Sequence, residues 1–518
     1  MTSALALNLE SLPTEVHECH QIIRLIYAAL SVQQAQYESL KQQILNLRRA
    51  HFGQSAERMM AQPELFTEPV TIPVPPVVTE TISYERAKAG RPALPKDLPR
   101  IRLEYDLPEA DKACTCCGGE LEKIGEETSE QLDYIPAQLQ VITHARQKYA
   151  CRCGSSGVKT AELPAQPLPK SNASANLLSH VLVSKYQDHL PLNRLERIFQ
   201  RNGMAISRST LCDWVLGSTE LLSVLTDQLK QHVLAAPRIH ADDTILPLQV
   251  PEKKRTVQAR AWAYVGAGHI EQEGKWIEHP AAVVYEFTDS RRGEHVQRFL
   301  KGYQGYLQAD AYAGFDALYT GGTILEVGCW AHARRKFFDI AAAQPQPIGL
   351  AHEALAWIGS LYDIERTIKD DPPDKKREVR QREAVPRLTE FRTWLEAHLR
   401  TLLPRSPLAG AFGYTLSNWT ALTRYPGNGI LEIDNNLCER AMRPIAIGRK
   451  NWLFAGSERG GRAAAIAYSL IQTCVFHDIE PFAYLADILK RLPSHQINRV
   501  SELLPFNWKK AQSEIKTA

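Results

Sequence analysis

The chain has 518 residues, of which 44% are hydrophobic and 23% are charged, with a formal net charge of +3. The apolar content suffices for one large core and several small ones, so we expect a multidomain protein. No run approaches the roughly 18 apolar residues of a membrane span, and the start lacks the layout of a signal peptide. These patterns argue against a membrane protein and predict a cytoplasmic location. The small net charge leaves any nucleic-acid binding to local basic patches.

Residues 15–50 are predicted to form a coiled-coil helix. Two series of positions repeat every seven residues between Ile22 and Leu47, and seven of these eight positions are apolar. Such a seam indicates self-association into a homo-oligomer, in which the one polar member, Gln33, sets the register. The alternative is a single amphipathic helix that packs on a globular body.

A proline-rich linker over residues 51–110 is expected to separate this helix from a small cysteine-rich module over residues 111–160. In a cytoplasmic chain, clustered cysteines favour a metal site over disulfides. Five of the ten cysteines lie in the module, namely Cys114, Cys116, Cys117, Cys151 and Cys153.

Residues 171–235 have a helical pattern. The span from Leu190 to Trp214 predicts a helix, a tight turn at Asn202 and Gly203, and a second helix that begins at Ser207. This arrangement is typical of a DNA-binding helix-turn-helix. The alternative is an ordinary helical hairpin that binds no DNA.

Residues 236–480 change to a pattern of strands followed by helices. We expect a mixed α/β domain here, with a charged helical insertion at about 345–405, and a helical tail over 481–518. The predicted strands cover residues 239–247, 259–267, 281–287, 306–309 and 323–327, with a helix at 295–300 between them.

Two aspartates lie on or beside these strands. Alternation in the first strand puts His240 and Asp242 on one face and Asp243 on the other, so one of the two aspartates can share a site. Asp310 follows another short strand and opens onto a loop. Acids in apolar surroundings are costly unless they are paired or bind metal. The alternative is that each aspartate only caps a turn.

A third acid lies in the segment 434–444. Its Asp-Asn-Asn start predicts the beginning of a helix that carries Glu439 and Arg443 on one face. Asp434 and Glu432 are competing candidates for a third ligand. Without a metal, the segment would be a capped helix with a surface ion pair.

Three carboxylates on separate elements suit a pair of magnesium or manganese ions, because hard cations take oxygen ligands and keep waters for chemistry. Two such ions can activate a water or a 3′-hydroxyl and stabilise the leaving oxygen of a phosphodiester. Basic runs with aromatic residues at 330–337 and 448–452 could contact the phosphate charge. Their alternative interpretation is a solvated helix face.

These segments together resemble the large DDE-type transposase of the insertion sequence 66 family over nearly the whole chain. The resemblance implies a ribonuclease-H-like catalytic core with a helical insertion between the second and third acids. It also implies catalytic roles for Asp242, Asp310 and Glu439, with water attacking one DNA strand and the freed 3′-hydroxyl then attacking target DNA. The similar stretches include residues 47–53, 90–92, 114–120, 125–136, 148–151, 207–211, 240–242, 307–314, 332–337, 434–443, 448–456 and 505–509.

The same resemblance implies residues that position metal and phosphate. These supporting residues are His332, Arg335, Asn436, Arg440 and Arg443. One departure lies beside the first acid, where Asp243 replaces a glutamate that is common in the family and keeps its charge.

The family's zinc-finger-like module implies a structural zinc ion, held here by Cys114 and Cys117 with the tighter pair Cys151 and Cys153. Four thiolates would stabilise a module that has little core of its own. Cys116 is a substitute ligand, and unligated thiols are the alternative.

Two other functions fit parts of the chain. A non-catalytic DNA-binding regulator needs only the coiled coil, the cysteine module and the helix-turn-helix, whereas the strand-rich region with all three acids argues against it. A metal-dependent nuclease would cut without joining. The expected partners are DNA, further copies of the chain and accessory transposition proteins.

Overall fold

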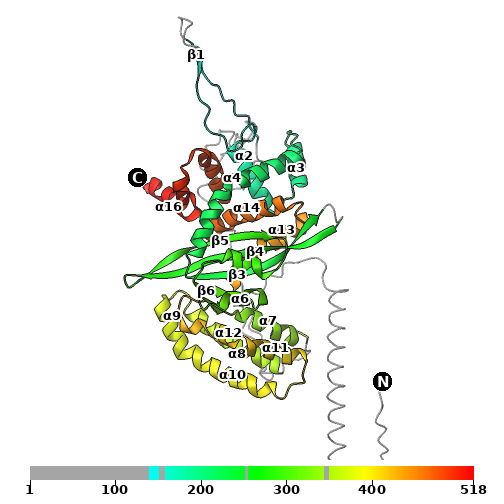
Figure 1. The fold of residues 1–518 in the computed structure, drawn as a ribbon, viewed down its shortest axis with the longest axis vertical. Helices are drawn as coiled ribbons and strands as arrows, with labels where there is room; N and C mark the ends of the chain where they lie inside the picture. Colours follow the sequence, from blue (N-terminus) through cyan, green and yellow to red (C-terminus); the bar gives the residue numbers. More distant parts are fainter. Residues whose placement is uncertain (1–138, 151–157, 251–254, 344–348, 518) are drawn as a thin grey trace, which may run out of the picture. The chain divides into compact units, whose positions relative to one another are not determined.

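A computed structural model describes residues 139–150, 158–250, 255–343 and 349–517 (Figure 1). The chain divides into two compact units, and residues 146–517 belong to the unit described below. The predicted coiled coil, the linker and the four proposed zinc ligands Cys114, Cys117, Cys151 and Cys153 lie outside the described residues.

The unit is built around a five-stranded mixed sheet with the order β5-β4-β3-β6-β7. Strands β3, β4 and β5 pair antiparallel, whereas the short strands β6 and β7 run parallel, β6 to β3 and β7 to β6. This sheet confirms the expected mixed α/β architecture, although β4 and β5 extend several residues beyond their predicted ends. The strands are β3 Arg238–Val250, β4 Arg255–Gln272, β5 Lys275–Thr288, β6 Gly305–Gln308 and β7 Ile324–Val327.

Helices pack against the sheet, and one of them approaches β4 closely at a glycine. All seven residues from Ala261 to Ala267 in β4 are buried, as expected for a strand covered on both faces. A Cβ atom at Gly266 would lie 2.8 Å from the Cα of Val233, so glycine permits this contact. The covering helices are α4 Arg208–Leu234, α13 Asn436–Trp452 and α14 Glu458–Phe476.

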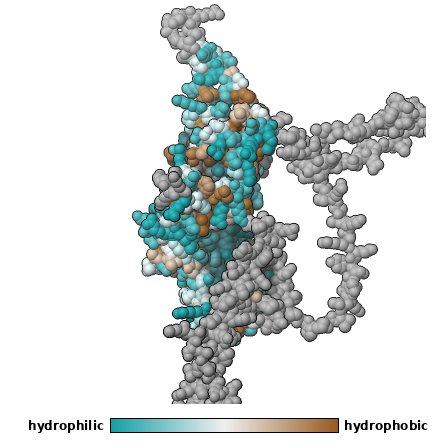
Figure 2. All heavy atoms as spheres, turned by 90° about the vertical axis from the view of Figure 1, so that its right-hand side faces the viewer, coloured by the Kyte–Doolittle hydropathy of each residue, from teal (hydrophilic) through white to brown (hydrophobic). Residues whose placement is uncertain are grey.

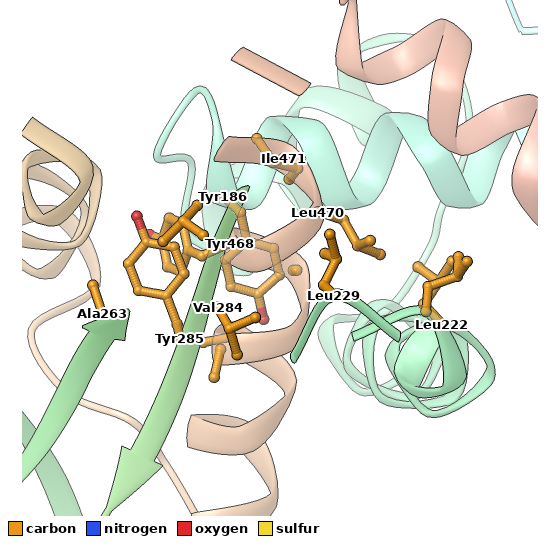
Figure 3. Close-up of a cluster of buried hydrophobic side chains, with 14 of the residues drawn as sticks. Tyr186, Leu222, Leu229, Ala263, Val284, Tyr285, Tyr468, Leu470 and Ile471 are labelled. Carbon is orange, nitrogen blue, oxygen red and sulfur yellow. The ribbon is translucent and has the colours of Figure 1, made fainter. Parts of the chain in front are cut away.

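One hydrophobic core joins the helices before the sheet, the sheet itself and the end of the chain. Figure 3 shows part of it, where Tyr186, Tyr285 and Tyr468 gather from α2, β5 and α14. The predicted segments 171–235, 236–480 and 481–518 therefore share one core. Further helices that contribute to it include α2 Ala175–Tyr186, α3 Leu192–Arg201, α5 Gly293–Phe299 and α15 Pro481–Arg491.

The predicted helix, turn and helix are present as α3 and α4. Gly203 has a φ of +82° in the turn, which favours glycine. Ser207 caps α4, since its side chain accepts the backbone N–H of Thr210. The local sequence signals thus predicted where α3 ends and where α4 begins.

A second hydrophobic core is formed by helices between β7 and α13, and it extends to Ile433. We expected the helical insertion to end at about residue 405, but two further helices continue to Leu422. Its elements are α7 Trp330–Ala341, α8 Leu350–Thr367, α9 Pro373–Val379, the π-helical turn η4 Arg380–Ala384, α10 Val385–Leu399, α11 Pro407–Ser417 and α12 Trp419–Leu422.

The second core contains a buried ion pair. The Arg380 side chain is 1% exposed, and its guanidinium donates to both carboxylate oxygens of Glu365 at 2.8 and 2.6 Å. It also donates to the backbone carbonyls of Tyr425 and Asn428. The arginine therefore joins α8, η4 and the loop before α13.

We expect Arg380→Met to lower the free energy of unfolding by about 3 to 5 kcal/mol, because it leaves the carboxylate of Glu365 buried without a partner. Urea unfolding of the variant and the wild type measures this loss. Lys375→Met is the matched control, since its ion pair with Asp371 is exposed on the lysine side and should contribute less than about 1 kcal/mol. Equal losses in both variants would contradict the prediction.

Three histidines surround the end of the chain. The rings of His232 and His279 stack at 4.0 Å between centroids, and Phe506 packs against His232 and His477 at 4.5 and 5.7 Å. Burial lowers the pKa of all three, that of His232 to about 4. These rings are therefore neutral in the folded protein at pH 7, and Phe506 anchors α16 Pro505–Thr517 beside them.

A lower pH should weaken the packing of Phe506 and α16 against these histidines. Because the folded pKa of His232 lies below the unfolded value, its stabilising contribution is complete above about pH 6.5 and is lost as the pH falls towards 4. We expect His232→Gln to reduce the loss of stability between pH 7 and pH 5 by about 1 to 2 kcal/mol, a value discounted for the partly exposed ring. Thermal unfolding across this pH range tests it, and parallel curves for variant and wild type would contradict it.

Among the described residues, no helix combines the length and the apolar composition needed to cross a membrane. The part of the surface that Figure 2 colours by hydropathy is mostly hydrophilic, and its apolar residues form small groups.

Candidate active site

The sheet places Asp310 beside Asp242. In the parallel pairing of β3 with β6, His240 lies opposite Gln308. Continuing this register by two residues brings Asp242 opposite Asp310, which follows the end of β6. The side chain of Asp242 accepts the backbone N–H of Asp243 at 2.8 Å, which orients its carboxylate.

The beginning of α13 is tied to the same strand. Asn435 donates its amide to the carbonyl of Ala241 at 2.9 Å, and its side-chain oxygen lies 2.9 Å from Nδ1 of His240. His240 is fully buried, so it anchors the helix rather than facing solvent. This connection brings Glu439, in the first turn of α13, towards the two aspartates.

The two competing acids have structural partners. Asp434 is buried and accepts hydrogen bonds from the Tyr362 hydroxyl at 2.9 Å and from the backbone and side-chain nitrogens of Asn436 at 3.0 and 2.8 Å. Glu432 pairs with Arg238 at 3.1 Å and is 45% exposed. These contacts give both acids a structural role without a ligand, and the Asp434 carboxylate caps the beginning of α13 by accepting from Asn436.

Two bases from α7 face Glu439. Nδ1 of His332 lies 3.6 Å from one carboxylate oxygen of Glu439, and Arg335 lies 3.8 Å from the other. Both residues come from the basic run at 330–337 that the sequence singled out. α7 and α13 therefore meet at the third acid.

The carboxylates influence one another electrostatically. Burial raises the pKa of Asp242 to about 7; the backbone N–H of Asp243 opposes this rise, and the charges of Asp310 and Glu439 add to it. Burial also raises the pKa of Asp310, against the opposing charges of His332 and Arg291. Three ionised carboxylates so close together would repel one another, and a bound cation would reduce that repulsion.

An open cleft of about 400 Å³ lies beside these residues, and the sequence interpretation missed several members of its lining. Its lining residues are Arg291, Asp310, Ala311, Tyr312, Ala313, His332, Arg335, Lys336, Asp339 and Tyr414. Acidic, basic and aromatic groups thus face one space.

Arg291 is the most informative residue that sequence reasoning missed. Its guanidinium lies 2.8 Å from Asp243 and 3.7 Å from Asp310, and it stacks over the ring of Tyr312 at 4.0 Å. Asp243 is 3% exposed and pairs with Arg260 through its other oxygen at 2.9 Å. Asp243 therefore holds two arginines near the cleft. The available signal was the Arg291-Arg292 pair, four residues after the end of the predicted strand 281–287.

The other supporting candidates lie farther along α13. Arg440 and Arg443 are both exposed on this helix. The positive charge of Arg440 adds to burial and to Arg238 in lowering the pKa of His240. Neither arginine lines the cleft described above.

The oxygen donors of Asp242, Asp310 and Glu439 fit hard divalent cations. One carboxylate oxygen of Glu439 is shielded from solvent and has no hydrogen-bond partner within the described part of the chain. A buried acceptor without a donor is costly, and a cation would satisfy it.

Comparison with known families identifies the class of protein, a transposase. The model described as "Transposase IS66 family" matches residues 170–463, and the "IS66 C-terminal element" matches 469–506. The "zinc-finger binding domain of transposase IS66" matches 111–154, and the model "Transposase C of IS166 homeodomain" matches 39–103. The chain belongs to the IS66 transposase family, as the resemblance of its motifs predicted.

Similar proteins occur in Sinorhizobium fredii (strain NBRC 101917 / NGR234). The uncharacterized protein y4hP is 36% identical over 446 residues, which cover 83% of this chain and 79% of that protein. The uncharacterized protein y4jD is 36% identical over 427 residues, which cover 81% of this chain and 82% of that protein. Their names assign no activity.

Proposed function

We propose that this transposase cleaves DNA at the ends of a mobile element and joins the freed 3′-hydroxyl to target DNA. The observation that carries the proposal is the convergence of Asp242, Asp310 and Glu439 from β3, the end of β6 and α13 beside a cleft with basic side chains. The mixed sheet, with its helical insertion between the second and third acids, supports a ribonuclease-H-like catalytic core.

Asp242, Asp310 and Glu439 would hold the magnesium or manganese ions. Bound divalent ions lower the pKa of an attacking water or hydroxyl and neutralise charge on the phosphate in the transition state. The protein's own contribution is to fix the three carboxylates on rigid elements, through the β3–β6 register and the contacts of Asn435.

Basic groups around the cleft would bind the scissile phosphate. Arg291 and Arg335 lie beside Asp310 and Glu439, and Lys336 packs over the ring of Tyr414 at 4.3 Å. Cations positioned where negative charge develops stabilise a phosphoryl-transfer transition state. Nδ1 of His332 lies 3.6 Å from one carboxylate oxygen of Glu439, so its charge when protonated would also face the phosphate.

The helix-turn-helix would bind the DNA backbone and bases of the element end. The beginning of α4 is exposed, and a helix N-terminus attracts phosphate. The surrounding exposed arginines supply positive charge, namely Arg194, Arg197, Arg201 and Arg208.

The match to the zinc-finger model supports a zinc ion at Cys114, Cys117, Cys151 and Cys153. A homo-oligomer through residues 15–50 and accessory proteins complete the proposed assembly.

The experiment that tests this function measures strand cleavage and joining by the purified full chain on labelled DNA with its element ends, with magnesium or with a chelator. Magnesium-dependent cleaved and joined products are expected. Cleavage without joining would replace the proposal with a nuclease. Binding of the ends with neither product, even with candidate accessory proteins, would replace it with a DNA-binding regulator.

A further inference from the structure

A sulfur and a nitrogen ligand lie beside the third carboxylate. Single ligand atoms of Cys329, His332 and Glu439 all lie within 4.8 Å of one another. We propose that these three side chains form a binding site for a borderline transition-metal ion of the zinc class, distinct from the all-oxygen site for magnesium.

The beginnings of two helices create this cluster. Cys329 precedes the first residue of α7, and His332 lies three positions later, so both side chains belong to the same end of the helix. Sγ of Cys329 accepts the backbone N–H of Asn435 at 3.2 Å, which joins this end of α7 to the beginning of α13. Glu439 lies in the first turn of α13. The positive ends of both helix dipoles favour negative charge here, whereas burial raises the pKa of the Cys329 thiol, so the thiolate would form only as a metal binds.

Two of the three ligand atoms have unmet hydrogen-bonding capacity. Nδ1 of His332 and Oε1 of Glu439 are shielded from solvent, and neither makes a hydrogen bond within the described residues. They face each other at 3.6 Å, which is too long for a hydrogen bond. Buried polar atoms of this kind are costly, and one cation coordinated by both would satisfy them.

The donor types select the metal. Magnesium takes oxygen ligands, whereas zinc binds thiolate sulfur, imidazole nitrogen and carboxylate oxygen in one tetrahedral site. Three protein ligands leave a fourth position for water or a substrate oxygen. The Cys329 thiol would release its proton to solvent as the metal binds, with no change of oxidation state.

The shared ligand gives the site a regulatory consequence, and this part rests on the proposed function. Glu439 cannot serve fully in both sites, so an ion of the zinc class would withdraw the third carboxylate from magnesium. We expect zinc to inhibit strand cleavage in competition with magnesium.

Cobalt(II) tests the site without DNA or activity, because cobalt bound to a thiolate has a charge-transfer absorption. The full chain is titrated with cobalt, and absorption and bound metal per chain are measured for wild type, Cys329→Ser, His332→Gln and Cys474→Ser. Cys474 is the matched control, since it is also a buried free cysteine, on α14. Every variant keeps residues 111–154, so cobalt bound there cancels in the comparison.

The expected result is that Cys329→Ser and His332→Gln each bind about one cobalt ion fewer per chain than wild type, or bind it at least about tenfold more weakly. Cys474→Ser should bind cobalt as wild type does. Wild-type stoichiometry and spectrum in both Cys329→Ser and His332→Gln would overturn the site. Failure of strand cleavage would leave this binding result intact, so the two proposals fail separately.

Discussion

Asp242→Asn is expected to reduce both strand cleavage and joining by at least about 10³-fold, with binding to the element ends retained. The carboxylate lies in the middle of β3 and is fixed by the backbone N–H of Asp243. Asparagine keeps the shape and this hydrogen bond but removes the charge that would hold a divalent ion. Loss of several kcal/mol of metal-dependent transition-state stabilisation corresponds to this factor.

The same loss is expected for Asp310→Asn and Glu439→Gln, because all three carboxylates would serve one metal site. Glu432→Gln is the matched control, since this acid pairs with Arg238 and is 45% exposed. Cleavage and joining are measured on labelled element ends, and binding is measured by gel shift. If Glu432→Gln abolished both reactions while Glu439→Gln retained them, the assignment of the third acid would be wrong.

Removal of the charge at the first acid has a second observable consequence. Because burial and neighbouring charges raise the pKa of Asp242 to about 7, its ionised form destabilises the metal-free fold above that pH. Magnesium should therefore raise the melting temperature of the wild type at pH 8, and this increase should shrink in Asp242→Asn.

Arg291→Gln is expected to slow cleavage by about 10²-fold and to weaken binding of the element ends much less. Arg291 lies 3.7 Å from Asp310, lines the cleft and is oriented by Asp243 and by the ring of Tyr312. A preorganised cation in this position would stabilise charge that develops on the phosphate, and loss of one such group typically costs 10²- to 10³-fold.

Two measurements distinguish a specific role of Arg291 at the phosphate from a general effect of positive charge on the surface. Arg292→Gln removes an equal charge from the next residue, which is exposed and, among the described residues, donates only to Ser290 through its Nε, so we expect less than a threefold effect. Single-turnover cleavage rates at saturating protein remove differences in binding. If Arg291→Gln and Arg292→Gln slowed this rate equally, Arg291 would act only through the net charge of the surface.

Much of the local structure followed from sequence patterns. The expected strands 239–247 and 323–327 correspond to β3 and β7, and the cap at Ser207 marks the start of α4. Alternation, capping residues and turn glycines act over a few positions, so one sequence displays them directly. The family motifs likewise identified Asp242, Asp310 and Glu439 as candidates.

The extent of the helical insertion was harder to predict. Helices α11 and α12 continue beyond residue 405, and the second core closes only at Ile433. The contacts that define this end join residues far apart in the chain, such as Trp330 and Trp419, whose rings lie 5.9 Å apart. Helix propensity alone does not show which helices share a core.

The sequence by itself determined the family, the alternating strands and the candidate acids, because each depends on residue types at short, regular spacing. Only the tertiary structure decided which groups surround those acids. The β3–β6 register aligns Asp242 with Asp310, Asn435 joins α13 to β3, and Arg291 approaches from the end of β5. These partners are separated by up to 195 positions in sequence, and their contacts arise when helices and strands pack, a step that no local pattern encodes.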